Sequence, residues 1–170
     1  MRLHLLSVGR RMPGWVEQGF VEYAKRLPPE CRLSLVEIEP AQRGKGRGKG
    51  RGKAGASEAL RERSRDEEGE RLLKAVPSGA LVIALDLGGR AWSTEELAGR
   101  LDAWLAGGRD VALLVGGPDG LSAACLARAE QRWSLSPLTF PHPLVRIILA
   151  EQIYRAWSIR AGHPYHRGDR

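Results

Sequence analysis

Short apolar runs alternate along this chain with longer stretches whose apolar residues recur at helical spacing. Residues 80–86 (ALVIALD) and 111–115 (VALLV) are almost continuously apolar, which is typical of strands buried on both faces of a parallel sheet. Residues 3–8 (LHLLSV) form a similar run, residues 33–38 alternate with the period of a strand, and residues 133–135 are a short fifth candidate. The pattern therefore predicts five strands.

Helices are predicted in the stretches between these runs. They are expected over residues 13–26, 57–75, 93–106, a short stretch from 122, and 143–159. Ser57 is expected to cap the second helix, and Ser93 with Glu96 has the pattern of a capping box for the third. Gly88-Gly89 is expected to turn the chain before this third helix. The alternation predicts one α/β domain over residues 1–170, with a mostly parallel sheet and helices on both faces.

The net charge of +7 comes almost entirely from one segment. Residues 43–53 read RGKGRGKGRGK and hold six positive charges, so the rest of the chain carries a net charge of only +1. Alternating glycines and mutually repelling charges cannot form a packed core, which predicts a flexible surface loop over about residues 43–56. We expect this loop to contact RNA phosphates; a tolerated low-complexity insertion is the alternative.

Several classes of protein are disfavoured by the sequence. No apolar run approaches the roughly 18 residues of a membrane span, and residues 1–10 do not have the pattern of a secretory signal. Cys31 and Cys125 form no zinc or disulfide pattern, so the cytoplasm is the expected location. The spacing of His163 and His166 suits metal ligands, but no cysteine or acidic cluster accompanies them, and no metal is expected. Neither the dinucleotide fingerprint nor the P-loop pattern is present.

Two loops that follow predicted strands are candidates for a ligand site. Residues 116–120 (GGPDG) follow the strand at 111–115, and paired glycines allow a ligand to approach the backbone closely. Residues 134–143 (SLSPLTFPHP) combine three prolines with three hydroxyl residues, which is typical of a rigid loop with free polar groups. A plain tight turn and a structural connection are the respective alternatives.

The C-terminal part of the chain is a third candidate. Arg146, Glu151 and Arg155 interrupt an otherwise apolar helix, and buried groups of this kind need partners, either in a dimer interface or in a site. Residues 163–167 (HPYHR) interleave aromatic and basic side chains, a pattern that suits RNA. A frayed terminus is the alternative for this tail.

These segments together resemble the ribosomal RNA large subunit methyltransferase H family. The resemblance rests on GGPDGL, WSLSPLTFPHPLVRIILAEQIYRAWSI and HPYHR, and extends to LHLLSVGRRMPGWVEQGFVEYAKRLP and LVIALDLGGRAWS. It covers nearly the whole chain except about residues 44–56. The RGKG run and the final residues 168–170 depart from the family pattern, which leaves the details of RNA docking open.

The resemblance implies a fold and a reaction. The implied fold is of the SPOUT type, with a C-terminal trefoil knot, in a homodimer whose active sites lie at the interface. The implied reaction is transfer of a methyl group from S-adenosylmethionine to N3 of a pseudouridine in helix 69 of 23S rRNA, in the assembled ribosome. No membrane or DNA partner is expected.

The resemblance also implies which residues carry the reaction. Contacts with S-adenosylmethionine are implied for Leu85, Gly116, Gly117, Leu135, Ser136, Pro137, Leu138, Thr139 and Phe140. Polar residues near the target base are implied to be His142, Arg155, Tyr165, His166 and Arg167.

Two chemical routes for the proton on N3 stay open at this point. An imidazole, of His142 or His166, accepts the proton in the first route. In the second route a guanidinium, of Arg155 or Arg167, stabilises the N3 anion and no protein base is needed. Two other functions also remain: a non-catalytic ribosome- or RNA-binding factor, and a SPOUT enzyme that acts on tRNA.

Overall fold

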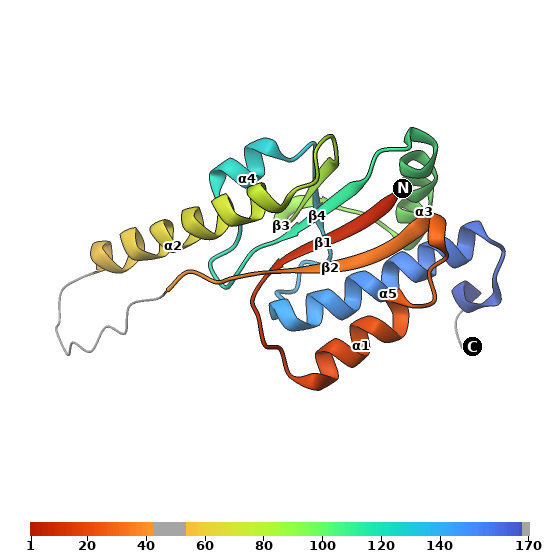
Figure 1. Cartoon of the computed structure of the whole chain (residues 1–170), viewed down its shortest axis with the longest axis horizontal. Coiled ribbons are helices and arrows are strands. Elements are labelled where there is room, and N and C mark those ends of the chain that lie inside the picture. The colour runs from red at the N-terminus through yellow and green to blue at the C-terminus, as the bar shows by residue number, and fades with distance from the viewer. Residues whose placement is uncertain (43–53, 168–170) are drawn as a thin grey trace.

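Five parallel strands form the centre of the computed structural model, which describes residues 1–42 and 54–167, without the side chains of residues 54–56 and His166 (Figure 1). Their order across the sheet is β2-β1-β4-β3-β5, and every neighbouring pair is parallel. The strands are β1 (Arg2–Val8), β2 (Arg32–Ile38), β3 (Leu81–Ala91), β4 (Val111–Val115) and β5 (Gln131–Ser134). The predicted parallel α/β architecture is confirmed, and the basic run at 43–53 lies outside the described residues.

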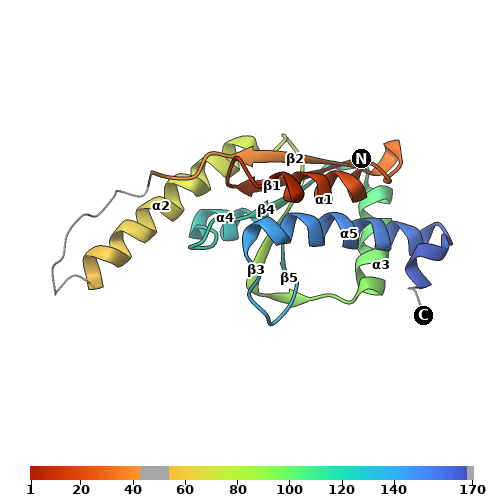
Figure 2. The same ribbon diagram turned by 90° about the horizontal axis from the view of Figure 1, so that it is seen from below.

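Helices cover both faces of this sheet. They are α1 (Gly14–Ala24), α2 (Ala54–Ala75), α3 (Thr94–Gly107), α4 (Ala123–Arg128) and α5 (His142–Arg160), with 3-10 turns η1 (Pro29–Cys31) and η2 (Pro164–Arg167). One face packs against α1, α3 and α5, and the other against α2 and α4 (Figures 1 and 2). The trefoil knot that the family resemblance implies stays a prediction.

The alternation of side chains along β1 explains the two layers. Leu3 and Leu5 belong to the core under α1, α3 and α5, whereas Leu6 and Val8 belong to the core under α2 and α4. All five residues of β4 are buried, because this strand has a neighbour on each side and helices on both faces. This double burial explains the continuous apolar runs in the sequence.

The expectation that Gly88-Gly89 turns the chain out of the sheet is wrong. Both glycines lie within β3, which continues to Ala91. Trp133 of β5 pairs with Leu85 and again with Arg90, so the intervening residues bulge out of the ladder. A Cβ on Gly89 would lie 2.7 Å from the backbone nitrogen of Trp133, so only glycine allows the two strands to come this close.

The helix ends confirm one expectation and correct another. Ser93 accepts from the Glu96 N–H, and the Glu96 side chain accepts from the Ser93 N–H, so the predicted capping box at the start of α3 is present. Ser57, in contrast, lies inside α2, which begins at Ala54 and therefore also shortens the predicted loop at 43–56. Ala54 and Ala56 favour the helix, which begins before the candidate cap.

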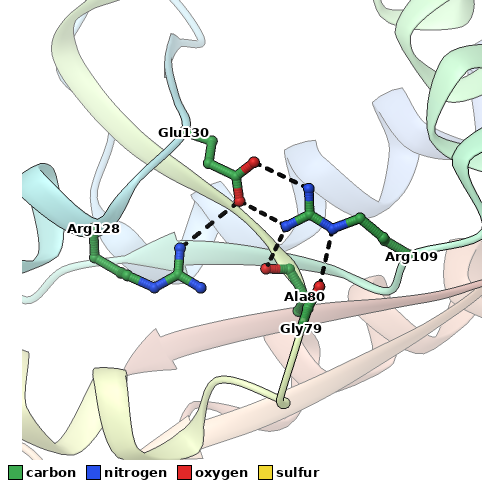
Figure 3. Close-up of polar contacts among 5 residues, drawn as sticks. All are labelled: Gly79, Ala80, Arg109, Arg128 and Glu130. Carbon is green, nitrogen blue, oxygen red and sulfur yellow. Dashed lines mark hydrogen bonds and ion pairs between the residues drawn. The ribbon is translucent and has the colours of Figure 1, made fainter.

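Arg109, which precedes β4, forms hydrogen bonds with residues at the amino ends of β3 and β5 (Figure 3). Its guanidinium donates to the carbonyls of Gly79 and Ala80, which precede β3, at 3.0 and 3.2 Å. It also binds both carboxylate oxygens of Glu130, just before β5, at 2.8 and 3.1 Å. This bonding raises the pKa of Arg109 and lowers the pKa of Glu130, so both side chains are charged at neutral pH.

The structure predicts that Leu113→Ala in β4 will lower the free energy of unfolding by about 2–5 kcal/mol, since it opens a cavity in a fully buried strand. Leu60→Ala on α2, where the side chain is 61% exposed, is the matched control and should change stability by no more than about 0.5 kcal/mol. Urea unfolding of the two variants measures the difference. A loss for Leu113→Ala as small as that of the control would contradict the assigned core.

Candidate active site at the carboxyl ends of three strands

A cavity of about 620 Å³ opens at the carboxyl ends of β3, β4 and β5. Its volume lies in the range of small-molecule sites. The ladder between β3 and β4 ends at Ala84, so the bulge of β3 and the loops after β4 and β5 meet at one edge of the sheet. The cavity is lined by residues 85–87, 115–121, 133, 135, 136, 138–142 and 145.

Eight of the nine residues expected to contact a methyl donor line this cavity. They are Leu85, Gly116, Gly117, Leu135, Ser136, Leu138, Thr139 and Phe140. Pro137 is the exception, because the lining passes from Ser136 to Leu138. The structure therefore brings together residues from β3 and from the loops after β4 and β5 that the resemblance alone had grouped.

The turn after β4 is built by close backbone packing. A Cβ on Gly116 would lie 2.5 Å from both the carbonyl carbon and the oxygen of Gly120, a distance that no side chain tolerates. The Gly120 N–H donates to the Gly117 carbonyl at 2.9 Å, and Gly120 has a positive φ of 81°. Glycines at 116 and 120 are thus required to form this wall of the cavity.

The proline-rich loop after β5 is held by its own hydroxyl groups. The Ser134 hydroxyl donates to the Ser136 carbonyl at 3.2 Å, and the Ser136 hydroxyl accepts from the Leu138 N–H at 3.0 Å. Leu138 is 68% exposed at the rim of the cavity, and Leu87, from the bulge in β3, is 62% exposed. Two apolar side chains are thus presented to solvent at the mouth of the cavity.

Two carboxylates in the lining were not among the expected site residues. Asp86 follows the buried part of β3, and Asp119 lies in the glycine turn. Their negative charges complement a cationic ligand such as a sulfonium. The position of Asp86 directly after a buried strand was a signal in the sequence, because loops after parallel strands meet at one edge.

His142 also lines the cavity, as the first residue of α5. A Cβ on Gly9, which has a φ of 119°, would lie 3.3 Å from His142 Nε2 and 3.4 Å from Arg146 Nη2. The connection after β1 therefore passes close to this end of α5, and glycine is what makes the approach possible.

Arg146 anchors the start of α5 to the ends of β1 and β2. Its side chain is 1% exposed and donates to the carbonyl of Gly9 at 2.7 Å, to Glu37 Oε1 at 2.7 Å and to the Ser7 hydroxyl at 3.2 Å. The buried charge is thereby paired and hydrogen-bonded. Arg146, the first of the three charged residues that interrupt the helical pattern, therefore has its partners within its own chain.

Glu151, Arg155 and Tyr165 form a second polar cluster near the other end of α5. The Arg155 guanidinium and the Tyr165 hydroxyl both donate to Glu151 Oε1, at 2.8 and 3.1 Å. The bond with Glu151 raises the pKa of Arg155, and burial raises the pKa of Tyr165. Arg155 lies thirteen positions after His142, or roughly 20 Å along the axis, and no member of this cluster lines the cavity of its own chain.

The remaining expected residues lie in η2, beyond the end of α5. Arg167 is exposed there, and the His166 side chain lies outside the described residues. Within the described part of the chain, no group of three or more His, Cys, Asp or Glu residues is placed to hold a metal ion, and no helix is long and apolar enough to cross a membrane.

Two solved structures share the fold of this chain, and both are described as methylase family proteins. The fold resembles that of a methylase family protein from Haemophilus influenzae Rd KW20, with a TM-score of 0.50, 15% identity, and coverage of 96% of this chain and 68% of the other. A methylase family protein from Neisseria gonorrhoeae also gives 0.50, at 13% identity over 90% of this chain and 80% of its own. The family model described as predicted SPOUT methyltransferase matches residues 1–166.

The chain belongs to the SPOUT methyltransferase family. Within this family, "Ribosomal RNA large subunit methyltransferase H" of Thioalkalivibrio sulfidiphilus is 58% identical over 98% of this chain and 99% of its own. The protein of that name from Alkalilimnicola ehrlichii is 59% identical over the same shares. SPOUT methyltransferases use S-adenosylmethionine as methyl donor. The cavity fits that molecule, because apolar side chains, a glycine-lined backbone and two carboxylates suit an adenosine that carries a sulfonium.

Gly116→Ala should weaken binding of S-adenosylmethionine at least about tenfold, because the new Cβ must push the Gly120 backbone away and distort the turn. Isothermal titration measures the affinity. Gly99→Ala in α3, where a Cβ meets nothing within 4 Å, is the control and should bind the donor as the wild type does. If Gly116→Ala and the wild type bind S-adenosylmethionine with equal affinity, the turn does not contribute to the donor site.

Proposed function

We propose that this protein transfers a methyl group from S-adenosylmethionine to N3 of a pseudouridine in helix 69 of 23S rRNA, in assembled ribosomes of the cytoplasm. The observation that carries the proposal is the convergence of the glycine turn, the proline-rich loop and Leu85 on one cavity. The names of relatives that are 58% and 59% identical over nearly the full chain support a ribosomal RNA substrate.

We infer a homodimer from the distance between the donor cavity and the cluster of Glu151, Arg155 and Tyr165. His142 lies at the donor cavity, whereas Arg155 lies roughly 20 Å away along the same helix. Tyr165 lies in η2 and donates to Glu151, the carboxylate that also binds Arg155. A partner chain related by two-fold symmetry would bring its own Arg155 cluster and tail to the cavity. Trp15 and Val21 of α1 are 54% and 48% exposed, and α1 packs beside α5, so apolar surface is available there for such an interface.

Most of the catalytic effect is proposed to come from positioning. Bound S-adenosylmethionine supplies an electrophilic methyl group, and the protein holds the nucleophilic N3 in line with it, which is worth up to roughly 7–11 kcal/mol in effective molarity. The N3 proton is taken by the imidazole of His142 or His166, or else Arg155 and Arg167 stabilise the N3 anion. Tyr165 and Arg155 are held by Glu151, which fixes their orientation for the target base.

Methyl transfer to defined RNA substrates tests this proposal. We expect the purified protein, with labelled S-adenosylmethionine, to methylate intact ribosomes that lack the modification, and not tRNA. Methylation of tRNA would identify the alternative SPOUT activity. Failure to bind the donor at millimolar concentration would leave a non-catalytic ribosome-binding factor as the remaining function.

Complementation between two inactive variants tests the shared site. Gly116→Ala should impair the donor cavity and Arg155→Ala the cationic cluster, so each protein alone is expected to have little activity. Co-expression of the two differently tagged chains should restore about a quarter of the wild-type activity, because half of the randomly formed dimers then contain one intact composite site. No recovery in purified mixed dimers would show that each site is built from one chain.

A further inference from the structure

Glu68 is the one carboxylate that is buried among the residues that the structure describes. It lies on α2 and is 1% exposed, whereas its neighbours Glu67 and Glu70 face solvent. Burying a carboxylate without hydrogen-bond partners for both of its oxygens destabilises the folded state. The energetic cost of burying Glu68 makes it a candidate for a role other than stability.

The two oxygens of Glu68 have different surroundings. Oε1 accepts a hydrogen bond from the Ala41 N–H at 3.0 Å. Oε2 is buried and has no hydrogen-bond partner within the described part of the chain. This second oxygen would lie 2.8 Å from a Cβ on Gly117, so it rests directly against the backbone of the glycine turn.

The adjacent residue fixes α2 against the same region. A Cβ on Gly69 would lie 2.1 Å from Ser122 Oγ, the group that accepts from the Cys125 N–H to cap α4. The helix therefore touches the segment after β4 at Gly117 and again at Ser122. Glu68 is held in place by this packing and has little freedom to turn its carboxylate away.

We propose that Glu68 is a positioning residue for the donor-binding turn, a role that rests on the proposed function. Glu68 does not line the cavity, so it acts through Gly117. Its negative oxygen repels carbonyl oxygens and attracts N–H groups in a low-dielectric environment. It thereby favours the conformation of the turn in which Gly116 and Gly117 line the cavity and the Gly120 N–H donates to the Gly117 carbonyl.

Titration of two ligands into Glu68→Gln tests this role. The substitution keeps the size of the side chain and removes its charge. We expect the Kd values for S-adenosylmethionine and for its product S-adenosylhomocysteine to rise together, by about tenfold, which corresponds to about 1.4 kcal/mol. Both Kd values should rise by the same factor, because the turn would contact the adenosine that the two ligands share. Glu67→Gln, the same change at an exposed neighbouring position, is the matched control and should leave both affinities unchanged.

The outcomes separate this inference from the proposed function. Unchanged affinities in Glu68→Gln overturn the positioning role and leave the methyltransferase proposal intact. A loss confined to S-adenosylmethionine also overturns it, because it would reflect direct attraction of the sulfonium by the carboxylate. Failure of the wild type to bind either ligand overturns the proposed function and this inference with it.

Hydrogen exchange of the wild-type protein provides a second measurement, which does not depend on the variant folding. The Ala41 N–H is bonded to the same carboxylate that faces Gly117. When the donor immobilises the turn, exchange of the Ala41 amide should slow severalfold. Unaltered exchange at Ala41 under saturating donor would contradict the proposed link between Glu68 and the turn.

Discussion

The parallel pairing of β4 with β1 on one side and β3 on the other determines where the site lies. Leu113 at the centre of β4 pairs with Leu5 and with Ile83, and all three side chains are fully buried. Since these strands run in the same direction, their carboxyl ends lie at one edge of the sheet. The segments that follow them therefore lie close together at that edge. The cavity is thus a consequence of the hydrogen-bond ladders and of the apolar cores on both faces.

Glycines permit close packing both in the wall of the cavity, at Gly116, and around it. Glycines at 69, 89 and 116 each allow an approach that a Cβ would prevent, with distances from 2.1 to 2.7 Å to the nearest atoms. These approaches join α2 to the segment after β4, β3 to β5, and the two ends of the glycine turn. Pockets of this type have little freedom to deform, since the packed backbone has few alternative arrangements.

Two buried charges lie on opposite faces of the sheet, and their environments differ. Arg146 on α5 has three hydrogen-bond partners from the ends of β1 and β2. Glu68 on α2 has a partner for one oxygen only. A fully paired buried charge fixes the geometry of its neighbours, and this accounts for Arg146 at the start of α5. In Glu68 only one oxygen has a hydrogen-bond partner, so the other oxygen acts electrostatically on the backbone beside it, which is the turn at Gly117.

The sequence by itself determined the strands, most of the helices and the glycine turn, because each depends on local properties: runs of apolar residues, the Ser93–Glu96 capping box and the absence of a Cβ. It did not reveal the bulge at Gly89, which exists only because β5 pairs with β3 on both sides of it. The partnership of Arg146 with Glu37, 109 residues apart, likewise depends on strand order. Local patterns fix which segments are strands or helices, whereas the contacts that build the site form only when distant segments are brought together by packing.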